Sequence, residues 1–352
     1  MLTGKRIVIT GGTGSLGKVL LRRLLSGEMG QPKKIIVFSR DEAKQHSLRM
    51  EYLQRKKATD EVIYRNFANL LEFRIGDVRD YHSVCEVLCD ADVVFNAAAL
   101  KQVPTCEYFP FEAVKTNIVG PENIVRAIQE LKLPVETVVG ISTDKACKPV
   151  NVMGMTKAIQ ERVFIRGNLG CPSTRFICVR YGNVLASRGS VIPLFHEQIK
   201  TGGPVTITTI EMTRFLLSLD QAVDTVFAAV KSANRGETYI PKMPSARIVD
   251  IVSALIADLP VKTIITGIRP GEKVHEILVS EEEATRTTDT GNYFVISPIL
   301  PELCKIELRD NVLGHEYSSS DNILSCEAVK ALLLSHNLLV GSENDLGTEL
   351  LR

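Results

Sequence analysis

Three glycines spaced three residues apart constrain this chain more than any other feature. Gly11, Gly14 and Gly17 stand in the segment RIVITGGTGSLGKVLLRRLL, directly after an apolar run and at the start of an amphipathic stretch. Glycine permits a tight turn and a close approach of backbone to a ligand, and the amides at a helix N-terminus attract phosphate. The segment therefore predicts a strand, a turn and a helix that bind a dinucleotide, with further contributions from Thr13, Ser15 and Leu16.

The first half of the chain alternates short apolar runs with stretches of helical periodicity. This order is typical of βαβ units that build a parallel sheet buried on both faces. The predicted strands are Arg6–Thr10, Lys34–Phe38, Leu71–Ile75, Val93–Ala97, Thr137–Ser142 and Phe176–Tyr181. The predicted helices are Leu16–Leu25, Ser83–Leu88 and Pro121–Leu131. We therefore expect an α/β fold with a Rossmann-type, doubly wound parallel sheet.

The pattern changes after about Asn183 to shorter, mixed elements with more loops, as in TGIRPGEKVHEIL. We expect a nucleotide-binding domain at residues 1–182 and a smaller mixed lobe for the substrate at 183–335, some of whose segments return to the first domain. The polar stretch 336–352 is expected to form a C-terminal tail.

Composition favours a globular protein with a small-molecule ligand. The formal net charge of the 352 residues is +1, which gives no electrostatic reason to expect nucleic acid or an anionic membrane as partner. No apolar run reaches the roughly 20 residues of a spanning helix, and the N-terminus lacks the pattern of a secretory signal. Eight scattered cysteines suit a reducing, cytoplasmic location, and neither they nor the six histidines show metal-ligand spacing.

The end of the second predicted strand bears on the choice of cofactor. Ser39 and Arg40 stand where an acidic residue would bind the free ribose hydroxyl of NAD. A hydroxyl and a guanidinium favour a 2′-phosphate, so NADP is the expected cofactor; a solvated strand end is the alternative for Arg40. The ends of the next two strands are expected to lie along the same ligand, through Asp77, Val78, Ala97, Ala98 and Ala99.

The segment STDKACKPVNVMGMTK follows the fifth predicted strand, where ligand sites of α/β sheets lie. Asp144 and Lys145 put an acid beside a base, and Lys157 adds a second amine. The segment contains no tyrosine, and Met153, four residues before Lys157, carries a thioether that cannot exchange a proton. The pair therefore predicts acid–base chemistry without a tyrosine, and a solvated Asp-Lys pair in a loop is the alternative.

Motifs along nearly the whole chain resemble those of the extended short-chain dehydrogenase/reductases, and more narrowly their nucleotide-sugar dehydratases. They occur in the order TGGTGSLG, FSRDEAKQ, GDVRD, AAALKQVP, EAVKTNIVG, STDKA, RYGNVLASRGSVIPLF, MTRF and RPGEKVHE. The set is similar to the C5-inverting UDP-N-acetylglucosamine 4,6-dehydratases of capsule and O-antigen synthesis. That family usually carries Tyr-x-x-x-Lys, but its N-acetyl-L-fucosamine branch resembles this chain in having methionine at the place of Met153.

The resemblance implies a reaction with no net redox change. NADP takes a hydride from C4 of the sugar, water is lost across C5 and C6, and the hydride returns to C6. Lys145 is expected to be the base at C5, Asp144 the acid at the C6 hydroxyl, and Thr143 a hydrogen-bond partner of the C4 oxygen. Lys157 is expected to hold the nicotinamide ribose and, with a dry pocket, to lower the pKa of Lys145. Because Met153 is inert, Asp144 or a water must accept the C4 hydroxyl proton.

Other residues are expected around the sugar nucleotide. The resemblance places Lys101 at the sugar or cofactor and makes Asn117 a support for the catalytic lysine; a solvated cation and an ordinary polar helix residue are the respective alternatives. Arg214 suits a pocket or an interface equally. The expected partners of the diphosphate, sugar and uridine are Asn183, Arg188, Ser190, Arg269 and Glu272.

The expected substrate is a UDP-N-acetylhexosamine, and relatives of this kind are commonly homo-oligomers, often hexamers. Two other functions stay open. One is a 4-epimerase for UDP-N-acetylglucosamine or UDP-glucose, in which the ketone turns over without elimination. The other is a catalytically silent NADP-binding regulator. The adjacent Asp144 and Lys145 favour dehydration over epimerisation.

Overall fold

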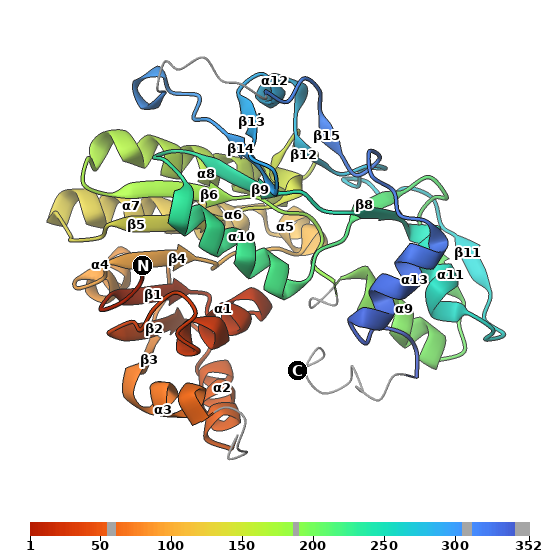
Figure 1. The fold of residues 1–352 in the computed structure, drawn as a ribbon, viewed down its shortest axis with the longest axis horizontal. Coiled ribbons are helices and arrows are strands. Elements are labelled where there is room, and N and C mark those ends of the chain that lie inside the picture. The colour runs from red at the N-terminus through yellow and green to blue at the C-terminus, as the bar shows by residue number, and fades with distance from the viewer. Residues whose placement is uncertain (55–60, 186–189, 305–311, 342–352) are drawn as a thin grey trace.

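Figure 1 shows the computed structural model, which describes residues 1–54, 61–185, 190–304 and 312–341. Its central sheet contains β1 (Arg6–Thr10), β2 (Lys34–Ser39), β3 (Leu71–Ile75), β4 (Val93–Asn96), β5 (Thr137–Ile141), β6 (Arg175–Val179), β9 (Thr238–Pro241), β13 (Thr287–Asp289) and β14 (Tyr293–Ile296). The strand order is β13-β14-β9-β6-β5-β4-β1-β2-β3. The strands from β9 to β3 in this order are parallel, and β14 and β13 are antiparallel.

Helices cover both faces of this sheet because its central strands are apolar on both faces. On one face, Leu21 and Val226 pack in one cluster with Ile9 of β1. On the other face, Ile124 packs in a second cluster with Val8. This arrangement confirms the predicted α/β, doubly wound fold. The covering helices are α1 (Ser15–Leu25), α4 (Tyr81–Leu88), α7 (Gly120–Leu131), α8 (Val152–Gly170) and α10 (Leu219–Ser232).

All six predicted strands are present, as are the three predicted helices, and no predicted end differs from the observed end by more than two residues. Local periodicity therefore located the buried elements well. Periodicity did not predict seven other elements between β1 and β6. These are α2 (Glu42–Gln54), α3 (Glu61–Leu70), α5 (Val103–Tyr108), α6 (Pro110–Val114), the π-helical turn η1 (Lys115–Val119), the turn η2 (Asp144–Ala146) and α8.

The C-terminal part of the chain builds a smaller lobe with its own core. Phe195, Ile251 and Leu333 pack in one apolar cluster there. The lobe contains α9 (Val191–Lys200), β7 (Val205–Ile207), β8 (Thr213–Phe215), β10 (Ser245–Arg247), α11 (Ile248–Ile256), β11 (Thr263–Ile265) and α13 (Cys326–Ser335). Between these elements the chain returns to the main sheet as β9, β13 and β14. The chain therefore passes repeatedly between the sheet and the lobe.

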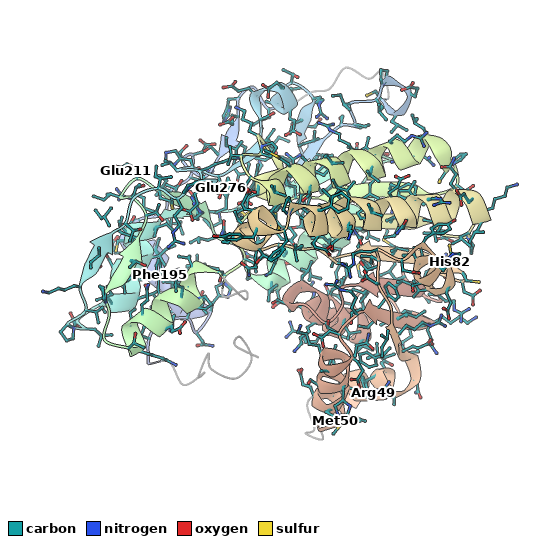
Figure 2. The ribbon with its side chains drawn as sticks, turned by 180° about the vertical axis from the view of Figure 1, so that it is seen from behind. Arg49, Met50, His82, Phe195, Glu211 and Glu276 are labelled. Atoms are coloured by element: carbon teal, nitrogen blue, oxygen red, sulfur yellow. The ribbon has the colours of Figure 1, made fainter. Side chains whose placement is uncertain are left out.

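A set of short elements joins the two parts. Seen from behind, the lobe with Phe195 lies beside the helices of the main sheet, and Glu276 lies at the junction (Figure 2). The joining elements are η2 (Asp144–Ala146), β12 (Ile277–Val279), α12 (Glu281–Ala284), η3 (Pro301–Leu303) and β15 (Tyr317–Ser318). Strand β12 pairs with β15 and packs against η2.

Among the described helices, none is long and apolar enough to cross a bilayer.

Candidate functional site

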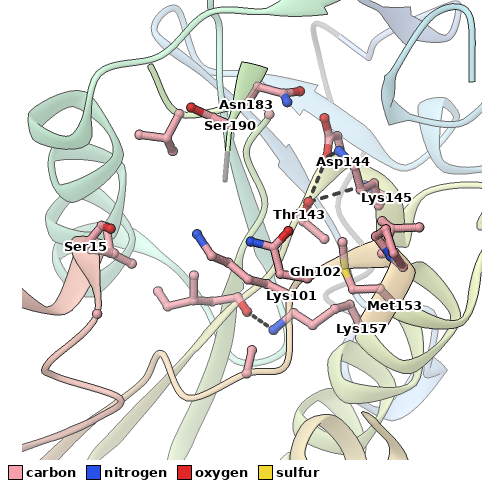
Figure 3. A pocket seen from close by; sticks show the side chains of 18 of the residues that line it. Ser15, Lys101, Gln102, Thr143, Asp144, Lys145, Met153, Lys157, Asn183 and Ser190 are labelled. Carbon is pink, nitrogen blue, oxygen red and sulfur yellow. Dashed lines mark hydrogen bonds and ion pairs between the residues drawn. The ribbon is translucent and has the colours of Figure 1, made fainter. Parts of the chain in front are cut away.

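A cavity of about 1120 Å³ lies between the carboxyl ends of the parallel strands and the C-terminal lobe. Figure 3 shows side chains from both parts of the molecule around it, among them Ser15, Lys157 and Asn183. Asn117 does not line the cavity, and Arg188 lies outside the described residues. The other residues expected from the sequence all line it: Gly11, Thr13, Gly14, Ser15, Leu16, Gly17, Ser39, Arg40, Asp77, Val78, Ala97, Ala98, Ala99, Lys101, Thr143, Asp144, Lys145, Met153, Lys157, Asn183, Ser190, Arg269 and Glu272.

The glycine loop allows the protein backbone to come close to a ligand. Gly11 has a φ of +66°, and a Cβ there would lie 2.7 Å from the amide nitrogen of Ala98. A Cβ on Gly17 would lie 2.5 Å from the Cα of Gly12, so helix α1 can pack this closely on the turn only with glycine. Gly14 caps α1, whose first amides are directed to the cavity end of the sheet. These residues fit the pyrophosphate of a dinucleotide.

The end of β2 carries the residues expected at the adenosine ribose. The side-chain amide of Gln45 donates to the Ser39 hydroxyl at 3.0 Å, which fixes that side chain. The Arg40 guanidinium lies 3.7 Å from the Asp77 carboxylate, and its side chain remains half exposed. Arg79 holds Asp77 from the other side at 2.8 Å. A half-exposed cation therefore lines the cavity, where it could bind a 2′-phosphate.

Asn117 acts behind the cavity wall. Its Oδ1 accepts from the backbone amide of Leu100 at 2.8 Å, and its Nδ2 donates to the carbonyl of the same residue at 2.9 Å. Nδ2 also donates to the Thr156 hydroxyl at 3.0 Å. Asn117 thus ties together the residues that precede Lys101 and Lys157, and it is buried completely.

Asp144 and Lys145 lie on the turn η2, directly after β5. The Asp144 Oδ1 accepts from the Thr143 hydroxyl at 2.7 Å and from the Lys145 ammonium at 3.1 Å (Figure 3). Asp144 is completely buried, and its Oδ2 has no hydrogen-bond partner within the described chain. Burial raises the pKa of Asp144, and the nearby Glu276 charge adds to this against the opposing effect of Lys145. Asp144 is therefore suited to hold and donate a proton.

Glu276 is a member of the site that our sequence analysis did not single out, although it ends the quoted motif RPGEKVHE. Its Oε1 lies 3.4 Å from the Lys145 Nζ and 3.6 Å from the Arg214 Nε. Arg214 is thereby placed at the cavity. The only available signal was the motif, because residues 145 and 276 are far apart in the chain and meet only after folding.

The expectation of a lowered pKa for Lys145 is wrong. Burial alone would lower the pKa of this lysine, but the Asp144 and Glu276 carboxylates outweigh burial and raise it. Lys157, the expected second cation, does not contact Lys145. Its Nζ donates instead to the Ile141 carbonyl and to Gln160 at 2.6 Å. Burial lowers the pKa of Lys157 to about 8.

Met153 lines the cavity from the first turn of α8 and is buried in a small apolar cluster with Cys106 and Ala113. In this cluster the thioether of Met153 packs against apolar side chains, and a thioether neither ionises nor takes up a proton. Met153, at the position where the family usually has a tyrosine, is thus part of an apolar wall of the cavity.

Unpartnered polar atoms concentrate at this cavity. Within the described ranges, five of the eight buried side-chain atoms without a hydrogen-bond partner belong to residues that line it. Buried polar groups are nearly always hydrogen-bonded in a finished structure, so this concentration points to a polar ligand. The five are Asp144 Oδ2, Asn183 Oδ1, Ser190 Oγ, Glu272 Oε2 and Glu276 Oε2.

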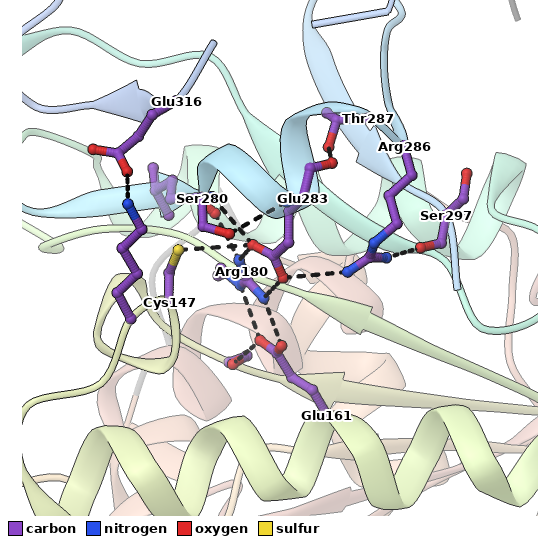
Figure 4. Close-up of polar contacts among 12 residues, drawn as sticks. Cys147, Glu161, Arg180, Ser280, Glu283, Arg286, Thr287, Ser297 and Glu316 are labelled. Carbon is purple, nitrogen blue, oxygen red and sulfur yellow. Dashed lines mark hydrogen bonds and ion pairs between the residues drawn. The ribbon is translucent and has the colours of Figure 1, made fainter. Parts of the chain in front are cut away.

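A largely buried ionic network lies behind the turn η2 (Figure 4). Arg180 donates to Glu161 at 2.6 Å and to Glu283 at 2.7 Å. Glu161 also accepts from the Ser142 hydroxyl at 2.5 Å, and the Cys147 thiol lies 3.7 Å from Glu283. Although burial opposes its ionisation, Arg180 holds the pKa of Glu283 at about 2. The network therefore fixes both ends of the segment that carries Asp144 and Lys145.

Comparison with known proteins gives the family. A family model described as polysaccharide biosynthesis protein matches residues 7–298. The chain belongs to the polysaccharide biosynthesis protein family. The resemblance to extended short-chain dehydrogenase/reductases that the sequence motifs indicated is thereby confirmed at the level of the family.

Relatives of this member of the polysaccharide biosynthesis protein family cover nearly its whole length. A Rickettsia canadensis (strain McKiel) protein named UDP-glucose 4-epimerase is 41% identical over 352 residues, covering 96% of this chain and 97% of that protein. The crystal structure of Pen from Bacillus thuringiensis is 35% identical with a TM-score of 0.84, and covers 96% of this chain and 100% of that one. The dTDP-glucose 4,6-dehydratase DesIV of Streptomyces venezuelae shares the fold, with a TM-score of 0.64 at 18% identity over 76% of this chain and 86% of its own.

Proposed function

We propose that this member of the polysaccharide biosynthesis protein family is a 4,6-dehydratase that converts UDP-N-acetylglucosamine to a 4-keto-6-deoxy sugar and inverts C5. The observation that carries the proposal is the pair of buried Asp144 and partly buried Lys145 at 3.1 Å on the cavity wall. Such a pair supplies an acid and a base to neighbouring carbon centres, which elimination of water requires. The family's description supports a role in the synthesis of a polysaccharide.

Each residue of the pair has one task in this reaction. Lys145 removes the C5 proton, and inversion follows when a proton that exchanges with solvent is added to the opposite face of C5. Asp144 protonates the departing C6 hydroxyl, for which its raised pKa suits it. A carboxyl that already holds a proton cannot accept another from the C4 hydroxyl, so water is the better acceptor there. Thr143 is available to the C4 oxygen, and Met153 excludes water from the wall it forms.

NADP is the proposed cofactor. When bound, it would supply reversible oxidation at C4, which makes the C5 proton acidic. The glycine loop and the ends of β2 and β4 would hold its adenosine and pyrophosphate, with Arg40 at the 2′-phosphate. Lys157, fixed by Gln160 and the Ile141 carbonyl, would hold the nicotinamide ribose. A structural neighbour solved with NAD supports pyridine-nucleotide binding by this fold.

The sugar nucleotide is proposed to lie against the lobe. Asn183, Ser190 and Glu272 offer polar atoms that lack partners among the residues that the structure describes. Arg269 also lines the cavity and is exposed, and its planar guanidinium suits the oxygens of a diphosphate. A UDP-N-acetylhexosamine satisfies this set, with the anionic diphosphate at Arg269.

A UDP-sugar 4-epimerase is the second candidate, and the names of the Rickettsia relatives favour it. An epimerase needs no acid at C6 and no base at C5, which leaves Asp144 and Lys145 without a task. Proton NMR of the reaction in deuterated water separates the two. A dehydratase gives a 6-methyl group and deuterium at C5, whereas an epimerase keeps the C6 hydroxymethyl group and its C5 hydrogen. The second result would refute the dehydratase proposal.

We also propose a homo-oligomer, with a hexamer expected from the family resemblance. Tyr108, Phe109 and Phe111 form an exposed aromatic group at α5 and α6, with exposed fractions of 82%, 60% and 67%. Exposed apolar groups of this size commonly mark a protein contact. Light scattering of the purified chain tests the assembly.

A further inference from the structure

Gln160 holds the side chain of Lys157 from within the same helix. Both residues lie on α8, three positions apart, so their side chains share one face of the helix. The Gln160 Oε1 accepts a hydrogen bond from the Lys157 Nζ at 2.6 Å. Gln160 has no exposed surface, and Lys157 is only 5% exposed. Bulk water therefore does not compete for this contact.

The two side chains meet at the end of a central strand. The carbonyl of Ile141, the last residue of β5, accepts from the Lys157 Nζ and, at 3.0 Å, from the Gln160 Nε2. The three residues thus form a closed triangle of hydrogen bonds. The Lys157 side chain is a flexible four-carbon stem, but the two acceptors fix its end.

The family resemblance implied that Asn117 supports this lysine. The Asn117 Nδ2 donates instead to the hydroxyl of the preceding residue, Thr156, at 3.0 Å. The side chain that contacts the Lys157 Nζ is Gln160, which our sequence analysis did not single out. The spacing of three residues on a helix was the only signal in the sequence.

The triangle leaves one donor of Lys157 for a ligand. The pKa of Lys157 is about 8 because of burial, so its ammonium form predominates at pH 7. An ammonium group has three N–H donors, and the triangle uses two of them. Lys157 lines the cavity (Figure 3), whereas Gln160 does not. The direction of the third N–H is therefore set before a ligand enters.

We infer that Gln160 is a positioning residue for the cofactor: it fixes the Lys157 ammonium so that the remaining N–H is directed to a hydroxyl of the nicotinamide ribose. The inference rests on the proposed function, and within it only on NADP as the cofactor. Binding is tighter when a flexible group is already fixed in the position that it takes in the complex. Gln160 therefore contributes to the affinity for NADP through Lys157, without a contact of its own to the cofactor.

Gln160→Met tests the inference, because methionine is unbranched like glutamine but has no amide. We expect NADP to bind this variant ~10-fold more weakly than the wild type, by calorimetry at pH 7 on the full chain freed of bound cofactor. Adenosine 2′,5′-bisphosphate has the 2′-phosphate but no nicotinamide ribose, so it should bind both proteins equally. A general disturbance of the fold would weaken both ligands. Gln129→Met, at an exposed glutamine of α7, is the matched control and should change neither affinity.

A double-mutant cycle shows whether Gln160 acts through Lys157. Lys157→Met should weaken NADP binding by ~30-fold, since it removes a charge-assisted hydrogen bond. Addition of Gln160→Met to this variant should then change the affinity by less than about twofold, because no ammonium is left to position. Independent effects, with a loss of ~300-fold in the double variant, would overturn the inference.

An unchanged or higher affinity for NADP in Gln160→Met would also overturn it, as would an equal loss for both ligands. If Gln160→Met does not fold, Gln160→Ser takes its place, because a serine fits the same space and is too short to reach the Lys157 Nζ. Failure of the proposed function looks different. A wild type that binds NADP but makes no 4-keto-6-deoxy sugar refutes the dehydratase and leaves this test in force, whereas a wild type that binds no NADP refutes both.

Discussion

Arg180 and Glu161 share two hydrogen bonds inside the molecule, with the Arg180 Nε 3.0 Å from Oε1 and the Nη2 2.6 Å from Oε2. The same guanidinium binds Glu283, so one cation compensates two buried carboxylates. Replacement of Arg180 by methionine would remove the ion pair of Glu161 and leave Glu283 with Arg286, which lies farther away at 3.6 Å. We expect Arg180→Met to lower the free energy of unfolding by about 3–5 kcal/mol, measured by urea denaturation.

The control for this change is Arg22→Met, which removes an exposed ion pair with Asp220. Exposed pairs contribute at most about 1 kcal/mol, so the two variants should differ clearly. Equal effects would mean that the Arg180 network does not stabilise the catalytic turn.

Asp144→Asn should abolish turnover without unfolding the chain. The amide keeps an oxygen for the Thr143 hydroxyl but cannot donate a proton to a leaving hydroxyl. Loss of a general acid should lower kcat by ~100-fold to ~10,000-fold, measured from the rate of 4-keto product formation. Asp220→Asn, at an exposed site, should leave turnover unchanged. Normal turnover in Asp144→Asn would show that Asp144 is not the acid of the reaction.

Lys157 should make stability depend on pH above neutrality. Its folded pKa is about 8 and its ordinary value is 10.5. Between these values the unfolded chain binds a proton that the folded chain has lost, so folding becomes more favourable as pH rises. The free energy of unfolding of the wild type, minus that of Lys157→Met, should rise by up to about 1.4 kcal/mol per pH unit in this window. A difference that is constant with pH would contradict the lowered pKa.

Met153→Leu should retain turnover within a few-fold. The two side chains have similar volumes, and such exchanges in a packed cluster usually cost less than about 1.5 kcal/mol. Met155→Leu is the control, because Met155 is exposed on the same helix. Complete inactivity of Met153→Leu alone would show that the thioether has a chemical role that we do not assign to it.

Arg40→Ala should change the preference between cofactors. Loss of a charge-assisted contact to the 2′-phosphate should weaken NADP binding by ~10-fold to ~100-fold and leave NAD binding nearly unchanged, as measured by calorimetry. Lys33→Ala removes an exposed cation before the same strand and should affect neither. If both cofactors bind the Arg40→Ala protein as before, Arg40 is a solvated strand end.

Features that depend on near neighbours in the chain could be predicted from the sequence. The strands of the first half are continuous apolar runs, so β1 and β5 were found nearly to the residue. The glycine turn followed from spacing alone, and Gly11 does take the positive φ that such a turn uses. Asp144, Lys145 and Lys157 line one cavity because each follows the end of β5, the edge where such folds bind ligands.

Features that depend on tertiary contact could not be predicted. Glu276 and Arg180 both stood in quoted motifs, but nothing local showed that one faces Lys145 and the other lies between two glutamates. The error over the pKa of Lys145 has the same origin. The sequence showed a nearby lysine at position 157, whereas the folded chain brings a carboxylate 131 positions away into contact instead.

Because Lys145 and Glu276 lie far apart in the chain, they are also synthesised at different times. The glycine turn and β5 leave the ribosome long before residue 276 is made, and a chain interrupted between them would carry dinucleotide-binding residues without the partner of its lysine. Fragments that arise from interrupted translation would thus lack a complete site, and activity would begin only once the last quarter of the chain has joined the fold.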